Sequence, residues 1–303
     1  MRIFENIAVG TNLCTRWDLK TALRYIRKIG FHGATPLADW PHAYVLNLTP
    51  AWIKEIRDVL QETGLFVASV NGFTAVGFAY FNEKEKELKS RVPKTKQYFG
   101  PIFSDSEAWR REWKVNYTKK VIDFAEAIGA GNVSIGSGYL PEGADRETAW
   151  KWMREAIKEC VEYAERKGVN VNIEYEPYLL VGSQEDADRI LSEIPSPNFG
   201  LNFDIGHSFV CGENVVDQIW RFRGRIYGVD IEDIGVDKSG RRIHKHLIPG
   251  TGVMPLFEIM CAFVESGYKG KYTLELYSQA HRPIKAMSES KKYLKDMEKT
   301  SPF

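Results

Sequence analysis

The chain has 303 residues, of which 44% are hydrophobic and 27% charged, and its 41 Lys and Arg residues nearly balance its 40 Asp and Glu residues. This length exceeds that of a small disulfide-stapled module and is sufficient for one large α/β domain. A formal net charge of +1 offers no basic excess to neutralise phosphates, which argues against a nucleic-acid-binding protein.

Short apolar runs alternate with amphipathic stretches along the whole chain. The runs predicted to be strands are 6–10, 32–37, 65–71, 132–136, 170–176, 199–204, 225–231 and 271–276. The stretches predicted to be helices are 18–29, 50–63, 112–129, 146–167, 184–193, 214–222, 255–266 and 284–297. Eight successive βα units predict an α/β fold, a (β/α)8 TIM barrel that forms a single domain over residues 1–303. No GxGxxG or P-loop pattern follows an early strand, which argues against a Rossmann fold.

One segment, residues 74–111, is longer than a usual connection between a strand and a helix. It follows the third predicted strand, so we expect it at the C-terminal face of the barrel, where TIM-barrel active sites form. Its charged run FNEKEKELKSRVPKTK is interpreted as solvated surface. Five aromatic residues lie at or near the ends of that run: Phe78, Tyr80, Phe81, Tyr98 and Phe99. They suggest an insertion that acts as a lid and excludes water.

The cysteines and the apolar runs predict the compartment. Cys14, Cys160, Cys211 and Cys261 lie far apart and form no CxxC pair, so we expect reduced, mostly buried thiols. The N-terminal residues lack the apolar core of a signal peptide, and no charge-free apolar run reaches about 18 residues. The expectation is a soluble cytoplasmic protein without a membrane segment.

Acidic residues stand at the ends of the last four predicted strands. They are Glu174 and Glu176, Asp204, Asp230 with Glu232 and Asp233, and Glu275. A single acid at such a place is explained equally well by a loop salt bridge or a helix N-cap. Acids on four consecutive barrel strands, however, converge on one axis and repel one another unless a cation neutralises them.

An oxygen-rich donor set suits a hard divalent cation better than a thiolate-bound zinc. We therefore predict that Glu176, Asp204, Asp230 and Glu275 bind one divalent metal ion. Mn²⁺, Mg²⁺ and Co²⁺ are the main candidates, and Zn²⁺ is a further one.

Four sequence motifs carry a family resemblance. NFDIGH, IPGTG and SGYKGKYTLELY, with the opening segment LKTALRYIRKIGFHGATPL, resemble the sugar phosphate isomerase/epimerase superfamily, also called xylose isomerase-like TIM barrels. The resemblance spans about residues 6–296 without the 74–111 insertion. It implies that Glu176, which precedes a proline, binds the metal together with Asp204 and Glu275, and that His207 contacts the substrate.

The resemblance also marks two departures from the family pattern. Asp230 stands where many relatives have a histidine, so the site resembles the all-carboxylate arrangement of xylose isomerases. His246 takes a position where sugar epimerases often carry an arginine, and it is predicted to be a second substrate contact. The other histidines are expected to be exposed or structural: His32, His42, His244 and His281. Trp17, Trp40 and Phe73 are read first as core residues and second as apolar walls of the pocket.

The activity implied by this resemblance is a divalent-metal-dependent sugar isomerase or epimerase. It would act on a keto-sugar or polyol through a metal-stabilised enediolate, with Glu176 and Glu275 as acid and base on opposite sides of the reacting carbon. The implied partners are a small carbohydrate and further copies of the chain in a dimer or tetramer.

Other functions remain open at this point. A lyase or dehydratase acting on a related keto-polyol or glycoside would use the same chemistry. An apurinic-site endonuclease is disfavoured by the balanced charge and the few histidines near the site. A binding or scaffold protein with a degenerate site is disfavoured by the four strand-end carboxylates.

Overall fold

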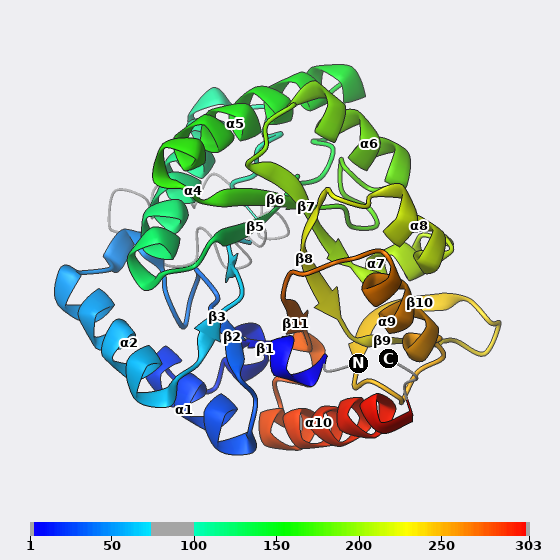
Figure 1. Cartoon of the computed structure of the whole chain (residues 1–303). Helices are drawn as coiled ribbons and strands as arrows, with labels where there is room; N and C mark the ends of the chain where they lie inside the picture. The colour runs from blue at the N-terminus through cyan, green and yellow to red at the C-terminus, as the bar shows by residue number, and fades with distance from the viewer. Residues whose placement is uncertain (1–2, 74–99, 301–303) are drawn as a thin grey trace.

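The computed structural model of the chain describes residues 3–73 and 100–300. Its core is one parallel sheet in the order β3-β2-β1-β11-β8-β7-β6-β5-β4, curled into a barrel and surrounded by helices (Figure 1). The strands are β1 Ile7–Gly10, β2 Gly33–Thr35, β3 Phe66–Val67, β4 Val70–Asn71, β5 Asn132–Gly136, β6 Asn170–Glu174, β7 Phe199–Asp204, β8 Ile226–Ile231 and β11 Tyr272–Leu274. The predicted TIM barrel is thereby confirmed.

The predicted third strand, 65–71, is two short strands that close the barrel between them. β3 pairs with β2, whereas β4 pairs with β5. An isolated parallel bridge between Leu37 and Asn71 joins the second strand position to β4. Two backbone hydrogen bonds support it, from Asn71 N to Pro36 O at 2.9 Å and from Ala38 N to Asn71 O at 2.8 Å. The nine strands therefore occupy eight positions around the barrel.

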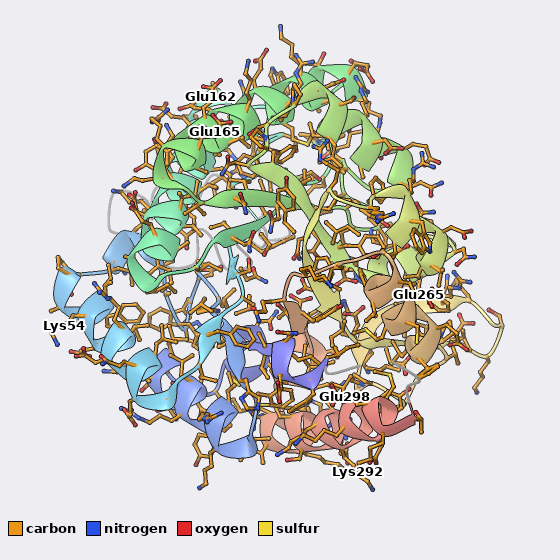
Figure 2. All side chains as sticks on the ribbon, viewed as in Figure 1. Lys54, Glu162, Glu165, Glu265, Lys292 and Glu298 are labelled. Atoms are coloured by element: carbon orange, nitrogen blue, oxygen red, sulfur yellow. The ribbon has the colours of Figure 1, made fainter. Side chains whose placement is uncertain are left out.

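Helices cover the outside of the sheet. They are α1 Leu19–Ile29, α2 Pro50–Thr63, α4 Ala108–Ile128, α5 Arg146–Lys167, α6 Gln184–Glu193, α7 Ile205–Val210, α8 Val215–Arg221, α9 Leu256–Glu265 and α10 Pro283–Thr300. α1 is capped as its sequence predicts: the Asp18 side chain accepts from Thr21 N, and Gly30 follows at φ 103°. Charged side chains such as Lys54, Glu162 and Lys292 point outward from this ring (Figure 2). Within the described residues, no helix is long and apolar enough to cross a membrane.

An antiparallel hairpin, β9 Asp233–Val236 with β10 Arg242–Leu247, extends the chain after β8. The sequence predicts no strand there, because charged residues of β10 such as Arg242 and Lys245 weaken its alternation of apolar and polar positions. Of the predicted insertion, residues 74–99 lie outside the described residues. Residues 100–107 pack on the barrel, where Ser104 donates to Tyr139 O at 2.7 Å. The helix predicted at 112–129 begins earlier, at Ala108.

The carboxylate of Asp233 holds the loop that follows the hairpin. This residue is 1% exposed, and its two oxygens accept four backbone N–H groups, those of Ile234, Gly250, Gly252 and Met254, at 2.9–3.1 Å. Asp233 is thus the structural member of the acidic group that follows β8. It shapes the IPGTG segment from within.

Replacing Asp233 by alanine is expected to lower the free energy of unfolding by about 3 kcal/mol. The change leaves several buried N–H donors without an acceptor, and each such loss is costly in a dry environment. Urea unfolding followed by circular dichroism measures the effect. Asp237→Ala is the matched control, because Asp237 makes similar bonds in a solvent-accessible turn where water can replace them. Equal losses in the two variants would contradict the role given to Asp233.

Candidate metal and substrate site

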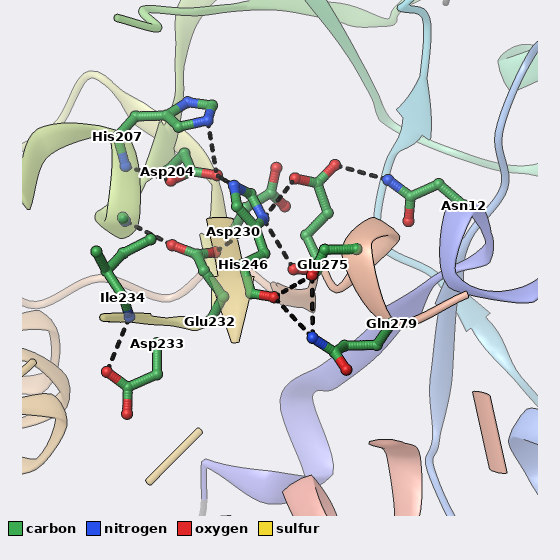
Figure 3. A network of polar contacts seen from close by, with 12 residues as sticks. Asn12, Asp204, His207, Asp230, Glu232, Asp233, Ile234, His246, Glu275 and Gln279 are labelled. Atoms are coloured by element: carbon green, nitrogen blue, oxygen red, sulfur yellow. Dashed lines mark hydrogen bonds and ion pairs between the residues drawn. The ribbon is translucent and has the colours of Figure 1, made fainter. Parts of the chain in front are cut away.

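Four carboxylates meet at the C-terminal ends of adjacent strands: Glu174 of β6, Asp204 of β7, Asp230 of β8 and Glu275, which directly follows β11. One oxygen from each lies within 4.8 Å of the others, and all four residues are buried. Strand register explains part of this convergence, because Asp204 is directly paired with Asp230. Three of its members, Asp204, Asp230 and Glu275, lie in the polar network in Figure 3.

Amide side chains hold these carboxylates in place. Asn202 lies on β7, between β6 and β8, and its Nδ2 donates to Glu174 Oε2 at 2.7 Å and to Asp230 Oδ2 at 2.6 Å. A Cβ atom at position 228 would come within 2.5 Å of Asn202 Oδ1, so Gly228 makes room for this amide. On the far side, Asn12 donates to Glu275 Oε1 at 2.9 Å (Figure 3). The network orients two carboxylates through a single asparagine.

Burial raises the pKa of all four acids, and repulsion from neighbouring carboxylates adds to the rise for three of them. Burial raises the pKa of Asp230 to about 6. The pKa values of Glu174, Asp204 and Glu275 are raised well above the ordinary range, first by burial and next by the Asp230 charge. A divalent cation among the four would offset both effects, because its opposite charge stabilises the ionised carboxylates where water is excluded.

Two histidines lie against the carboxylates. His207 Nδ1 is 3.2 Å from Glu174 Oε1, and His246 Nδ1 is 3.3 Å from Glu275 Oε2. Burial lowers the pKa of His246 to about 3 and that of His207 well below its usual value, so both rings are neutral. His244, expected as an exposed loop residue, instead lies half-buried on β10, with its ring 4.7 Å from that of His207.

Above the carboxylates is a cavity of about 380 Å³. Its polar wall includes Glu174, Glu176, His207 and Glu275, and its apolar wall includes Trp40, Phe73 and Tyr277. Of the aromatic residues singled out in the sequence, Trp40 and Phe73 are therefore pocket walls. Trp17 instead stacks on Tyr25 with ring centroids 4.5 Å apart.

The structure brings most of the predicted site together, with one difference. Asp204, Asp230 and Glu275 converge as predicted, and the fourth carboxylate among them is Glu174. Glu176 lies beyond the end of β6, where its backbone N–H donates to Val181 O at 3.2 Å. It groups instead with Glu174 and His207, and burial raises its pKa to about 7. Its role as a ligand stays a prediction.

The residues that hold the four carboxylates in place were not predicted from the sequence. Asn202 and Asn12 carried no signal, because an amide in a predicted strand or loop has many ordinary explanations. Glu232 was noticed but given no role, although it is fully buried and packs beside Asp204 and His246. His246, predicted to contact substrate, is also fully buried and is not among the described residues that line the cavity.

Comparison with known proteins agrees with the barrel fold. A family model described as xylose isomerase-like TIM barrel matches residues 23–297. Fructoselysine 3-epimerase of Shigella flexneri is 27% identical over 264 residues, which cover 86% of each chain. L-ribulose-5-phosphate 3-epimerase UlaE of Escherichia coli (strain ATCC 8739) is 28% identical and covers 64% of this chain and 67% of its own. Among solved structures, the IOLI protein with a bound zinc atom has a TM-score of 0.76 and 17% identity, with 98% of this chain and all of that one covered.

Proposed function

This chain belongs to the xylose isomerase-like TIM-barrel family, and on that basis we propose that it is a divalent-metal-dependent sugar epimerase or isomerase. The proposed substrate is a small keto-sugar or polyol. The observation that carries the proposal is the convergence of four buried carboxylates beneath a cavity of sugar size. The two curated relatives compared above are named as sugar 3-epimerases, which favours epimerisation beside a carbonyl group.

The donor set fits a hard divalent cation. All four donors are carboxylate oxygens, and Asp204 Oδ2 is buried without a hydrogen-bond partner in the described structure. We assign Glu174, Asp204, Asp230 and Glu275 as the residues that would hold Mn²⁺, Mg²⁺ or Co²⁺, with Glu174 as the ligand in place of Glu176, which was predicted from the sequence. When bound, such an ion would polarise the substrate carbonyl and stabilise the enediolate that forms on proton loss.

Proton transfer is assigned to Glu275 and Glu176. β11 and β6 are separated by β8 and β7 in the sheet, so their carboxylates enter the cavity from different sides. Glu275 Oε1 is fixed by Asn12, which positions the carboxylate to accept a proton from carbon. Burial raises the pKa of Glu176 to about 7, a value suited to returning a proton near neutral pH. Removing a proton on one face and returning one on the other inverts the carbon.

The cavity walls suit a sugar. His207 is neutral and lines the cavity, where its ring can hydrogen-bond a substrate hydroxyl. Trp40 and Phe73 offer the aromatic surface on which the C–H face of a sugar packs. These contacts orient the substrate over the carboxylates and displace water from the reacting carbon.

The test is proton exchange observed by NMR. Purified protein loaded with Mn²⁺ or Mg²⁺ and then exchanged into D₂O is incubated with fructoselysine, L-ribulose 5-phosphate and unmodified ketoses. We expect deuterium to enter the product at the single carbon that inverts, with every substituent retained. Release of water or of an aglycone would instead indicate the lyase or dehydratase. Failure of the loaded protein to exchange a proton of any keto-sugar would contradict the proposal.

A further inference from the structure

Helix α4 carries a lysine on the side that packs against the barrel. Lys114 is 3% exposed, and its Nζ donates to Gly72 O at 3.3 Å. The ammonium lies over the rings of Phe103 and Tyr117, 5.2 and 6.0 Å from their centroids. Burial lowers the pKa of Lys114 to about 8, so the side chain is still mostly charged at neutral pH. Burying a charge costs free energy that an apolar side chain of similar size avoids. Packing alone therefore does not account for a lysine at this position.

The carbonyl that Lys114 contacts belongs to a peptide group whose N–H bonds to a residue of the cavity. Gly72 C=O and Phe73 N–H are parts of one planar trans peptide unit, so the direction of the oxygen fixes that of the hydrogen on the opposite side. Phe73 N donates to Asn71 Oδ1 at 3.0 Å. The contact of Lys114 on one side of this peptide group therefore orients the Asn71 side chain on the other side.

Asn71 connects this peptide group to the proposed catalytic base. Its side chain is buried and lines the cavity. Because Phe73 N holds Oδ1, the amide presents Nδ2 to Glu275 Oε1, which lies 3.3 Å away. Asn12 donates to the same oxygen at 2.9 Å. Two amides thus hold one oxygen of Glu275, and one of them is held in turn by the peptide group that Lys114 contacts.

We propose that Lys114 is a positioning residue for the proton transfer assigned to Glu275, and that it acts through the Gly72–Phe73 peptide group and Asn71. Each donor in such a chain of hydrogen bonds is strengthened by polarisation from the one before it, and the chain begins at a full positive charge. Lys114 is not among the described residues that line the cavity, so it acts on the base and not on the substrate. The proposal rests on the proposed function for the role of Glu275.

The first experiment is a double-mutant cycle on turnover. Lys114→Met is expected to lower kcat by about 10-fold or more, because a small misplacement of a catalytic group has effects of this size. KM and the affinity for Mn²⁺ should change little. In an Asn71→Ala background the same change should have little further effect on kcat, because the connection to Glu275 is already cut. Lys120→Met, which replaces an exposed lysine of the same helix, is the matched control and should keep full activity.

The second experiment needs no substrate. Hydrogen exchange of the Asn71 side-chain amide is followed by ¹⁵N–¹H NMR, with its signals assigned by their absence from the spectrum of Asn71→Ala. We expect exchange to be about 10-fold or more faster in Lys114→Met than in the wild type, because the amide is no longer held toward Glu275. Lys114→Gln can still donate to Gly72 O but carries no charge, so both its kcat and its exchange rate should lie between those of the wild type and Lys114→Met.

Three results would overturn the proposal: an unchanged kcat in Lys114→Met, an undiminished loss in the Asn71→Ala background, or an Asn71 amide that exchanges at the wild-type rate. Urea unfolding shows whether Lys114→Met is folded, and if it is not, Lys114→Gln is judged by the same measurements. A wild type that exchanges no proton of any keto-sugar would refute the proposed function. The exchange rate of the Asn71 amide would then still show whether Lys114 orients that side chain.

Discussion

Replacing Glu275 by glutamine is expected to lower kcat for epimerisation by about 1,000-fold or more. Glutamine keeps the shape of the side chain and can still contact Asn12, but it cannot take a proton from carbon, and general-base catalysis alone contributes about 10²–10⁴-fold. The measurement is the initial rate at saturating metal and saturating keto-sugar, together with the rate of deuterium entry from D₂O. Both rates should fall together, because both require the same proton transfer.

The stability of the same variant separates a catalytic effect from a structural one. Burial and the neighbouring carboxylates raise the pKa of Glu275, so the metal-free protein is strained by this group. Removing a buried like charge should therefore leave the metal-free variant at least as resistant to urea as the wild type. Glu258→Gln, on the exposed face of α9, is the matched control and should keep full activity. A variant that lost activity only because it unfolded would contradict the role assigned to Glu275.

The barrel could be predicted from the sequence because its strands are buried on both faces. β7, for example, is buried at all six positions and reads as a bounded apolar run. Two features of the fold could not be predicted from the sequence. The break between β3 and β4 is set by pairing with different neighbours, which no local pattern records. The β9–β10 hairpin carries charged residues on an exposed face, so its period-two alternation is weak.

The sequence predicts that acidic residues at the strand ends form the site. It does not determine which of two neighbouring acids on one strand is the ligand. Side chains of Glu174 and Glu176 share a face because strands alternate with period two, so alternation cannot choose between them. The choice depends on where β6 ends, and it ends at Glu174. The role of Asn202 could not be predicted for a different reason. Its two hydrogen bonds join residues on the strands to either side, a relation that exists only after the barrel has closed.

Glu174→Gln is expected to weaken binding of the metal to the four-carboxylate group by 100-fold or more, whereas Glu176→Gln should leave that affinity nearly unchanged. Glu174 lies with Asp204, Asp230 and Glu275, and its loss removes one anionic ligand of four. Glu176 lies outside that group, so its amide variant should bind metal and lose turnover only. Isothermal titration with Mn²⁺ measures the affinities, and kcat is compared at saturating metal.

These two variants distinguish which glutamate binds the metal, because they make the same chemical change two residues apart, one at the end of β6 and one just beyond it. If Glu176→Gln lost the metal and Glu174→Gln kept it, the ligand predicted from the sequence would be right, and the turn after β6 would have to move on metal binding. If both variants kept the metal, the four-carboxylate group would not be the binding site. With Glu174 as ligand, Glu176 keeps a carboxyl whose pKa of about 7 is set by burial, and it remains able to exchange a proton with the substrate.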